Sequence, residues 1–230
     1  MSLNRPLAAS GGVDLSDARA VLFDVDGTLL ESSEFVYAGF AHALGHYGYR
    51  VPERAALPEL TSGTLEEVYA RLTLGDGDVP ALIEAHRSFQ EQHLSLCSVF
   101  PETPTVLAAL AQRGYRMAAI TSRSRRTSLR TLEVTGILPY FPVVISWEDV
   151  EQPKPHPEPV LRALSLLALH PRQAVMVGDA WADVEAGRSA GVRTVGVTYG
   201  PNGQRVAESA PDVLIASLDE LLSYLKPDDD

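Results

Sequence analysis

Hydrophobic residues recur along this chain at two spacings, and the spacing divides it into three stretches. Short apolar runs bounded by turn residues, which are typical of buried strands, lie just after residue 20 and again after residue 99. The later runs alternate with segments in which hydrophobic residues recur every three or four positions, as on one face of a helix. Residues 32–98 show only this helical spacing. The pattern predicts a strand, then a helical block, then alternating strands and helices.

Strands that alternate with helices favour a parallel sheet with helices on both faces. The strands are expected at residues 115–120, 143–145, 174–177, 194–197 and 213–215, and the helices at 103–112, 124–133, 157–167, 183–190 and 218–225. We therefore predict an α/β fold, in which an all-helical cap is inserted into a Rossmann-like parallel-sheet core. The expected divisions are a core at 20–31 and 99–226, a cap at 32–98, and flexible termini at 1–19 and 227–230.

The composition narrows the possible partners. The 230 residues carry a formal net charge of −11, and a nucleic-acid partner would require a basic surface. No apolar run approaches the ~20 residues that span a membrane, and the first residues do not resemble a signal peptide. The single cysteine, Cys97, cannot form an internal disulfide. We expect a cytoplasmic protein without a nucleic-acid or membrane partner, as a monomer or a homodimer.

The first apolar run ends abruptly at two carboxylates, Asp24 and Asp26, followed by Gly27. These residues would lie at the carboxyl end of a strand, where open α/β sheets place their ligands. Two neighbouring acids repel each other, and a divalent cation is the usual compensation. One carboxylate can then act as a nucleophile and the other as a general acid and base. The alternative is a solvated Asp-Gly turn at the end of the strand.

Three later clusters also follow expected strands. Thr121 and Ser122 precede a helix, where a hydroxyl and backbone amides favour an anion, although a cap residue is the ordinary interpretation. Lys154 lies among prolines, and it is one of only two lysines among the 19 Lys and Arg residues. It could neutralise a phosphoryl group or be an exposed loop residue. Asp179 and Asp183 could complete an Mg²⁺ site, and Asp183 could also be the N-cap of a helix.

In this order, the four clusters resemble those of the haloacid-dehalogenase-like phosphohydrolase superfamily, over about residues 20–225. The resemblance implies that Asp24 attacks phosphorus to form an aspartyl-phosphate and that Asp26 protonates the leaving group and then activates water. It also implies an Mg²⁺ site and a phosphate site. The metal ligands would be Asp24, Asp26, Asp179 and Asp183, with the backbone carbonyl of Asp26 contributing, and the phosphate would be bound by Gly27, Thr121, Ser122 and Lys154.

Other details separate branches of this superfamily. Its dehalogenases lack an acid at the position of Asp26, and its phosphonatases need a cap lysine, which residues 32–98 do not contain. The helical insert resembles the cap of the phosphoglycolate phosphatase and β-phosphoglucomutase group. Residues 126–136 and 147–160 resemble phosphoglycolate phosphatases and related inorganic pyrophosphatases, and the second of these segments is closer to the pyrophosphatases.

These similarities imply an Mg²⁺-dependent phosphatase that hydrolyses a small phosphorylated metabolite, a phosphoglycolate-like phosphomonoester. The alternatives are an inorganic pyrophosphatase, a sugar phosphomutase, or a ligand-binding module without turnover. Ser62 and Gly63 lie in the expected specificity loop of the cap. Four cap residues are candidates for a second anionic group of the substrate, although a solvated helix face is the ordinary interpretation of each: Arg71, His86, Arg87 and His93.

Overall fold

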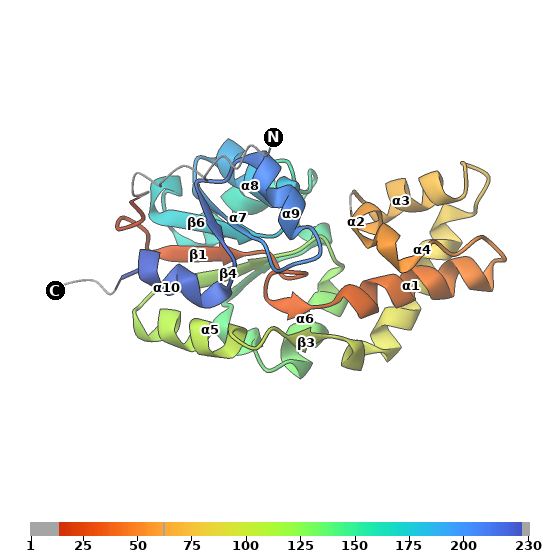
Figure 1. Cartoon of the computed structure of the whole chain (residues 1–230), viewed down its shortest axis with the longest axis horizontal. Helices are drawn as coiled ribbons and strands as arrows, with labels where there is room; N and C mark the ends of the chain where they lie inside the picture. Colours follow the sequence, from red (N-terminus) through yellow and green to blue (C-terminus); the bar gives the residue numbers. More distant parts are fainter. Residues whose placement is uncertain (1–13, 62, 227–230) are drawn as a thin grey trace, which may run out of the picture.

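The structure is a computed structural model that describes residues 14–61 and 63–226, and it has a six-stranded parallel sheet at its centre (Figure 1). The strands lie in the order β5-β4-β1-β6-β7-β8. Their bounds are Ala20–Phe23 for β1, Arg116–Ile120 for β4, Val143–Ile145 for β5, Ala174–Gly178 for β6, Arg193–Val197 for β7 and Val213–Ile215 for β8. The predicted α/β class with a parallel sheet is confirmed.

Strand β1 shows why the sheet is covered on both faces. All four of its residues are buried, and they alternate between two hydrophobic cores: Val21 and Phe23 face one, whereas Ala20 and Leu22 face the other. Residues of three helices join the first core: α5 (Thr103–Gln112), α6 (Arg125–Val134) and α10 (Leu221–Tyr224). Two helices, α7 (Glu158–Leu167) and α8 (Trp181–Ala190), supply the second core and cover the opposite face of the sheet (Figure 1).

A group of helices projects from one end of the sheet and has its own hydrophobic core (Figure 1). It consists of α1 (Ser33–His46), α2 (Leu57–Leu60), α3 (Leu65–Leu72) and α4 (Val79–Gln92). The chain enters and leaves this cap through two short antiparallel strands, β2 (Leu30–Glu31) and β3 (Ser98–Val99). The expected helical cap is therefore present. The strand pair was missed because two-residue strands carry no readable alternation.

The shorter elements complete the fold. Helix α9 (Gly203–Val206) follows β7, and short 3₁₀ turns occupy Arg54–Ala56, Leu94–Leu96, Leu138–Tyr140, Trp147–Asp149, Pro171–Gln173, Ala207–Ser209 and Leu218–Glu220. In the segment 1–19, which we expected to be flexible, the described part contains Leu15 and Ala18, both buried against the sheet. Residues 1–13 and 227–230 lie outside the described residues. Among those described, no helix is long and apolar enough to cross a membrane.

The close packing of α1 on α4 gives a test of the cap. A Cβ at Gly39 would lie 2.8 Å from His86 Nε2, and the His86 ring is buried and held by Tyr69 through a 2.8 Å hydrogen bond. Gly39→Ala should therefore lower the free energy of unfolding by about 1–3 kcal/mol. Gly45→Ala in the same helix meets nothing nearer than 4.0 Å and should be neutral or stabilising by up to about 1 kcal/mol. Urea unfolding measures both, and equal effects would contradict this packing.

Candidate active site

The candidate site lies where the strand order reverses. From β1 the chain continues to β4 and β5 on one side, and then returns to β6, β7 and β8 on the other side. The loops after β1 and β6 therefore begin side by side at the carboxyl edge of the sheet, which is where ligands bind in open α/β folds. Asp24 directly follows β1 and Asp179 directly follows β6.

Three carboxylates meet at this edge. Asp24, Asp179 and Asp183 each offer one oxygen, and the three oxygens lie within 4.8 Å of one another. The exposed fractions of these residues are only 7%, 2% and 2%, so Asp24 is not part of a solvated turn. Asp183 lies in the first turn of α8, where it accepts a hydrogen bond from the Ala180 backbone N–H at 3.1 Å. The alternative that Asp183 is the N-cap was wrong, because α8 already begins at Trp181.

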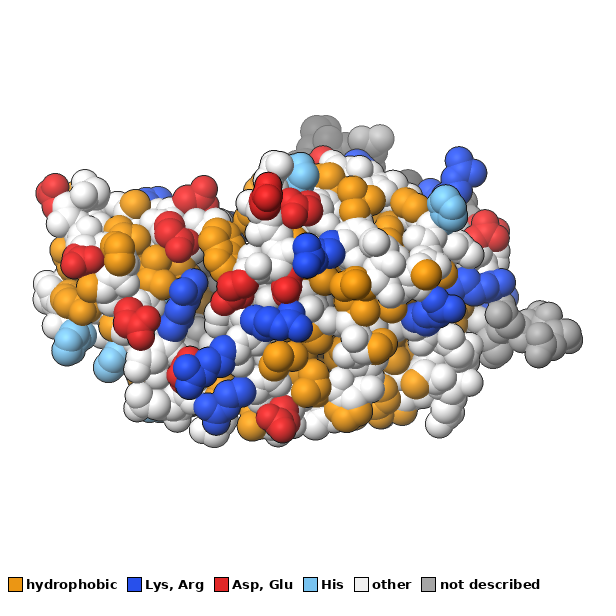
Figure 2. Space-filling view, turned by 180° about the vertical axis from the view of Figure 1, so that it is seen from behind, with side chains coloured by type: hydrophobic (Ala, Val, Ile, Leu, Met, Phe, Trp, Pro, Cys, Tyr) orange, Lys and Arg blue, Asp and Glu red, His pale blue; other side chains and the backbone are white. Residues whose placement is uncertain are grey.

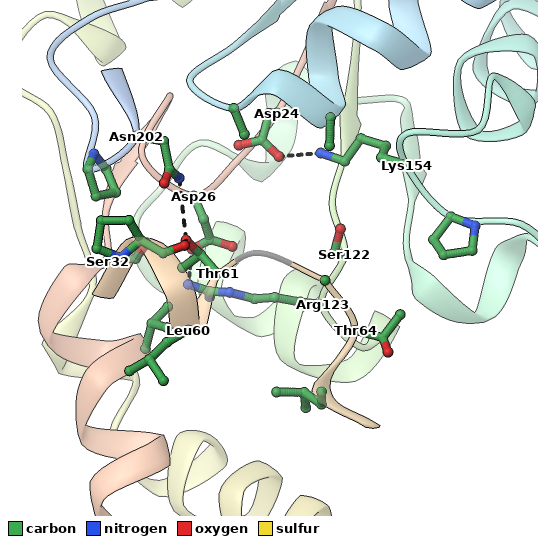
Figure 3. Close-up of a pocket in the computed structure, with 18 of the residues that line it drawn as sticks. Asp24, Asp26, Ser32, Leu60, Thr61, Thr64, Ser122, Arg123, Lys154 and Asn202 are labelled. Carbon is green, nitrogen blue, oxygen red and sulfur yellow. Dashed lines mark hydrogen bonds and ion pairs between the residues drawn. The ribbon is translucent and has the colours of Figure 1, made fainter. Parts of the chain in front are cut away.

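Lys154 enters this cluster from the loop before α7 (Figure 3). Its ammonium donates to Asp24 Oδ1 at 2.5 Å, to Asp183 Oδ1 at 2.6 Å and to the Ile120 carbonyl at 3.2 Å. The side chain is only 6% exposed, so Lys154 is not an ordinary loop lysine. Burial alone would lower its pKa, but the charges of Asp183 and Asp24 outweigh burial and raise the pKa, so the group stays an ammonium.

One ammonium does not neutralise three carboxylates. Burial raises the pKa of Asp24 well above its usual value; the Lys154 charge opposes this, and the Asp183 charge adds to it. Burial, together with the Asp183 charge, raises the pKa of Asp179 to about 7. A divalent cation would compensate this excess of negative charge. An all-oxygen donor set is the kind that Mg²⁺ or Ca²⁺ takes in proteins, so these residues fit such an ion.

Asp26 lies beside this group but does not belong to it. Its carboxylate forms an ion pair with the Arg123 guanidinium, and its side chain is 26% exposed (Figure 3). The Asp26 carboxylate is therefore not one of the three clustered acids, although it lines the same cavity. The expected part of Asp26 in metal binding stays a prediction.

Gly27 supports the acid cluster through its lack of a side chain. Its φ is +80°, and a Cβ there would lie 2.5 Å from Asp179 Oδ2. Thr121, at the end of β4, is buried, and its hydroxyl accepts a hydrogen bond from the Arg123 backbone N–H at 3.1 Å. Ser122 lines the cavity, whereas Gly27 and Thr121 are not among its lining residues. The structure thus brings the four sequence clusters together at one edge of the sheet.

A cavity of about 730 Å³ opens from the acid cluster towards the cap. Figure 2, seen from behind, shows charged side chains of both signs where the cap meets the core. Gly63, His86 and Arg87 line the cavity, but Ser62 lies outside the described residues. Burial lowers the pKa of His86 to about 3, with the Arg123 charge contributing, so His86 is neutral and cannot bind an anion as a cation.

The other two cap candidates do not line this cavity. Arg71 donates to the Glu59 carbonyl at 2.5 Å. His93 is hydrogen-bonded to the Phe89 carbonyl at 2.7 Å and stacks on that ring. Of the four cap residues named from the sequence, only Arg87 brings a cation to the cavity.

Sequence reasoning missed two residues of the site. Arg123 was not among the residues singled out from the sequence, and its contact with Asp26 joins residues 97 positions apart. Asn202 donates its backbone N–H to Asp179 Oδ2 at 3.1 Å, and its side chain lies 3.4 Å from the Thr61 hydroxyl in the cap (Figure 3). Asn202 could have been found from its position in the loop after β7, because that loop leaves the sheet at the same edge as the loops that carry the acid cluster.

Fold and site together define a parallel α/β protein with a carboxylate-rich centre under a helical cap. The family model of haloacid dehalogenase-like hydrolases matches residues 21–197. The chain belongs to this family, as its motifs implied.

Similar proteins agree with this assignment. The pyrophosphatase PpaX of Bacillus pumilus is 34% identical over 216 residues, which cover 93% of this chain and 99% of that protein. The PpaX of Bacillus velezensis is 35% identical over 205 residues, or 88% and 94% of the two chains. Among solved structures, a candidate haloacid dehalogenase-like hydrolase from Bacteroides fragilis superposes with a TM-score of 0.82 at 28% identity, covering 89% of this chain and all of that one.

The raised pKa of Asp179 predicts that neutralising it stabilises the metal-free protein. The unfolded carboxyl ionises near 3.8 and the folded one near 7, so this group removes stability as pH rises between those values. At pH 8 with EDTA, Asp179→Asn should raise the free energy of unfolding by about 1–4 kcal/mol, because each pKa unit corresponds to about 1.4 kcal/mol. The gain should shrink towards pH 4.

Asp149→Asn is the matched control for this measurement. Asp149 accepts hydrogen bonds from the Ser146 backbone N–H at 2.8 Å and the Ser146 hydroxyl at 2.5 Å, and it forms an ion pair with Arg125. Its substitution should therefore lower stability at pH 8. Thermal and urea unfolding report both variants. A loss of stability in Asp179→Asn at pH 8 would contradict the proposed excess of negative charge.

Proposed function

We propose that this protein is an Mg²⁺-dependent phosphatase that hydrolyses a small, phosphoglycolate-like phosphomonoester through an aspartyl-phosphate at Asp24. The observation that carries the proposal is the position of Asp24: its carboxylate is buried beside the Lys154 ammonium and two further acids, and it faces a cavity large enough for a small metabolite. A nucleophilic carboxylate, a fixed cation and a sheltered cavity are the elements that phosphoryl transfer needs.

The reaction proceeds in two displacements. In the first, an Asp24 oxygen bonds to phosphorus, the bond from phosphorus to the leaving oxygen breaks, and Asp26, which enters this step as the protonated acid, gives that oxygen its proton. In the second, Asp26 takes a proton from water, the water oxygen bonds to phosphorus, and the bond to Asp24 breaks. Inorganic phosphate leaves and both carboxylates return to their starting states. The Lys154 ammonium neutralises charge on the transferring group in both steps.

Mg²⁺ would be held by the carboxylates of Asp24, Asp179 and Asp183 and by the backbone carbonyl of Asp26. When bound, it supplies positive charge to the phosphoryl oxygens. The protein's own part is to hold these oxygens together in a buried site. Gly27 and Asn202 contribute to this arrangement, because Gly27 leaves room for the Asp179 carboxylate and Asn202 hydrogen-bonds to it.

Inorganic pyrophosphate is a second candidate substrate. The specific observation in its favour is that the PpaX pyrophosphatases are 34–35% identical over about nine-tenths of this chain. Pyrophosphate presents the same phosphoryl group to Asp24, with phosphate in place of an alcohol as the leaving group. The ratio of kcat/KM for phosphoglycolate and pyrophosphate distinguishes the two: a value above 1 supports our proposal, and a value below 1 selects the pyrophosphatase.

Removal of the proposed nucleophile tests the mechanism. Asp24→Asn should lower Mg²⁺-dependent phosphate release from phosphoglycolate by about 10³-fold or more, because no covalent intermediate can form. Acid-quenched wild-type protein should carry phosphate on the peptide that contains Asp24, as mass spectrometry would detect. The exposed cap carboxylate Asp76 provides a control, and Asp76→Asn should retain full activity. Unchanged turnover in Asp24→Asn would exclude this mechanism.

Arg87 tests the assignment of substrate recognition to the cap. If its guanidinium binds the carboxylate of a phosphoglycolate-like substrate, Arg87→Met should raise KM for phosphoglycolate by about 10-fold, which is typical of a lost charge-assisted hydrogen bond. KM for p-nitrophenyl phosphate, which lacks that carboxylate, should change less than about 2-fold. Arg71→Met is the control, because Arg71 does not line the cavity. Equal changes for both substrates would remove Arg87 from substrate recognition.

A further inference from the structure

The guanidinium of Arg123 lies buried between the acid cluster and the junction of core and cap. Its side chain is only 9% exposed, and it forms an ion pair with Asp26. Figure 3 shows the Arg123 side chain extending towards Asp26 from the loop that follows β4. A buried charge of this kind is costly unless it is paired, so the contact with Asp26 is a built feature of the site.

The remaining contacts of this guanidinium hold it in place. Its Cζ lies 4.4 Å from the ring centroid of Phe35, in a cation–π arrangement. Nη1 donates to the Thr131 hydroxyl at 3.3 Å, and both terminal nitrogens lie 3.8–3.9 Å from Cys97 Sγ. These partners belong to α1, α6 and the segment before β3. Because they come from separate parts of the chain, the guanidinium is fixed in position and orientation.

We propose that Arg123 is the positioning residue for Asp26: its immobilised guanidinium holds the Asp26 carboxylate in the orientation needed for proton transfer. The inference rests on the proposed function, in which Asp26 is the general acid and base. It assigns a role to Arg123, which is not one of the residues singled out in the four clusters found from the sequence.

Asp26 needs such a support because of its surroundings. Its side chain is 26% exposed and lies outside the buried group of Asp24, Asp179 and Asp183. A general acid must come within about 3 Å of the leaving oxygen, and a half-buried carboxylate free to rotate would spend little time there. Arg123 bonds to Oδ1 of Asp26, and the other oxygen remains available for the proton.

The contacts suit an arginine better than a lysine. A planar guanidinium can stack on Phe35 while its edge donates to Asp26 and Thr131 at the same time, whereas an ammonium is a point charge that cannot make this set of contacts. Phe35 lies just after β2 and Cys97 just before β3, so the same group also contacts both crossings between core and cap. The placement of Asp26 is thereby tied to the position of the cap.

The dependence on the leaving group tests this role. An alkoxide needs a proton to leave, whereas p-nitrophenolate does not. Because kcat/KM reports the first displacement, misplacing Asp26 should lower kcat/KM for the alkyl phosphate only, although hydrolysis of the phosphorylated Asp24 would slow with both substrates. Arg123→Met should lower kcat/KM for phosphoglycolate by about 100-fold and that for p-nitrophenyl phosphate by less than about 3-fold. Arg123→Lys should fall between wild type and Arg123→Met for phosphoglycolate. If Arg123→Met does not fold, the same two kcat/KM values are compared between Arg123→Lys and wild type.

Arg126→Met is the matched control. Arg126 lies three residues after Arg123, in the first turn of α6, and its ion pair with Glu91 at 3.1 Å also joins core to cap, but it is 70% exposed and does not line the cavity. Its substitution should leave kcat/KM for both substrates within about 2-fold of wild type. A comparable loss in Arg126→Met would mean that core–cap contact, and not the placement of Asp26, determines the rate.

A double-mutant cycle completes the test. With Asp26→Asn as background, adding Arg123→Met should change kcat/KM for phosphoglycolate by less than about 2-fold, because Arg123 acts only through Asp26. A further loss in that background, or an equal loss with both substrates in the single variant, would overturn the inference. Absence of phosphate release from both substrates in the wild type would instead overturn the proposed function itself.

Discussion

The candidate active site depends on the burial of three carboxylates around one ammonium at the carboxyl edge of the sheet. Removing an unpaired carboxylate from water costs several kcal/mol, so the cluster persists only because the strands beneath it are held in place by their own packing. Every residue of β1 is buried, and this strand lies at the centre of the sheet between β4 and β6. The hydrophobic cores on both faces thus stabilise an arrangement of charges that is unfavourable by itself and that a divalent cation would relieve.

The cap is attached to this rigid core in a different way. Across the mouth of the cavity the links are polar: Arg205 pairs with Glu59 at 3.0 Å, and Asn202 lies 3.4 Å from Thr61. Exposed ion pairs of this type contribute about 0–1 kcal/mol. Beside β2, where the chain passes from core to cap, the contact is apolar instead, because Phe35 is fully buried. The contacts at the mouth are therefore weaker than the buried apolar contact beside β2, and such a distribution would let a cap open for substrate and close to exclude water.

The sequence predicted those parts of the fold that follow local rules. The helix at 103–112 and the strands at 143–145 and 213–215 have the expected bounds, because their patterns are regular and their ends carry turn signals. The four motif clusters also converge as expected, since parallel strands share one carboxyl edge. The ion pair between Arg123 and Asp26 was not predictable, because no spacing rule connects a loop after β4 with one after β1. Likewise, α8 starts two residues early because Asp183 accepts from the backbone within its first turn.

Asp24 and Asp26, in the loop after β1, are paired with two different cations, and this difference fits their proposed roles in the reaction. Asp24 is paired with a compact ammonium that it shares with Asp183, so one buried cation lies beside both the proposed nucleophile and a proposed metal ligand. Asp26 is paired with a guanidinium that three further side chains hold in place. A nucleophile that becomes phosphorylated benefits from a compact positive charge beside it, which can neutralise charge on the transferring group. A group that delivers and then collects a proton at one position benefits from a cation that cannot move.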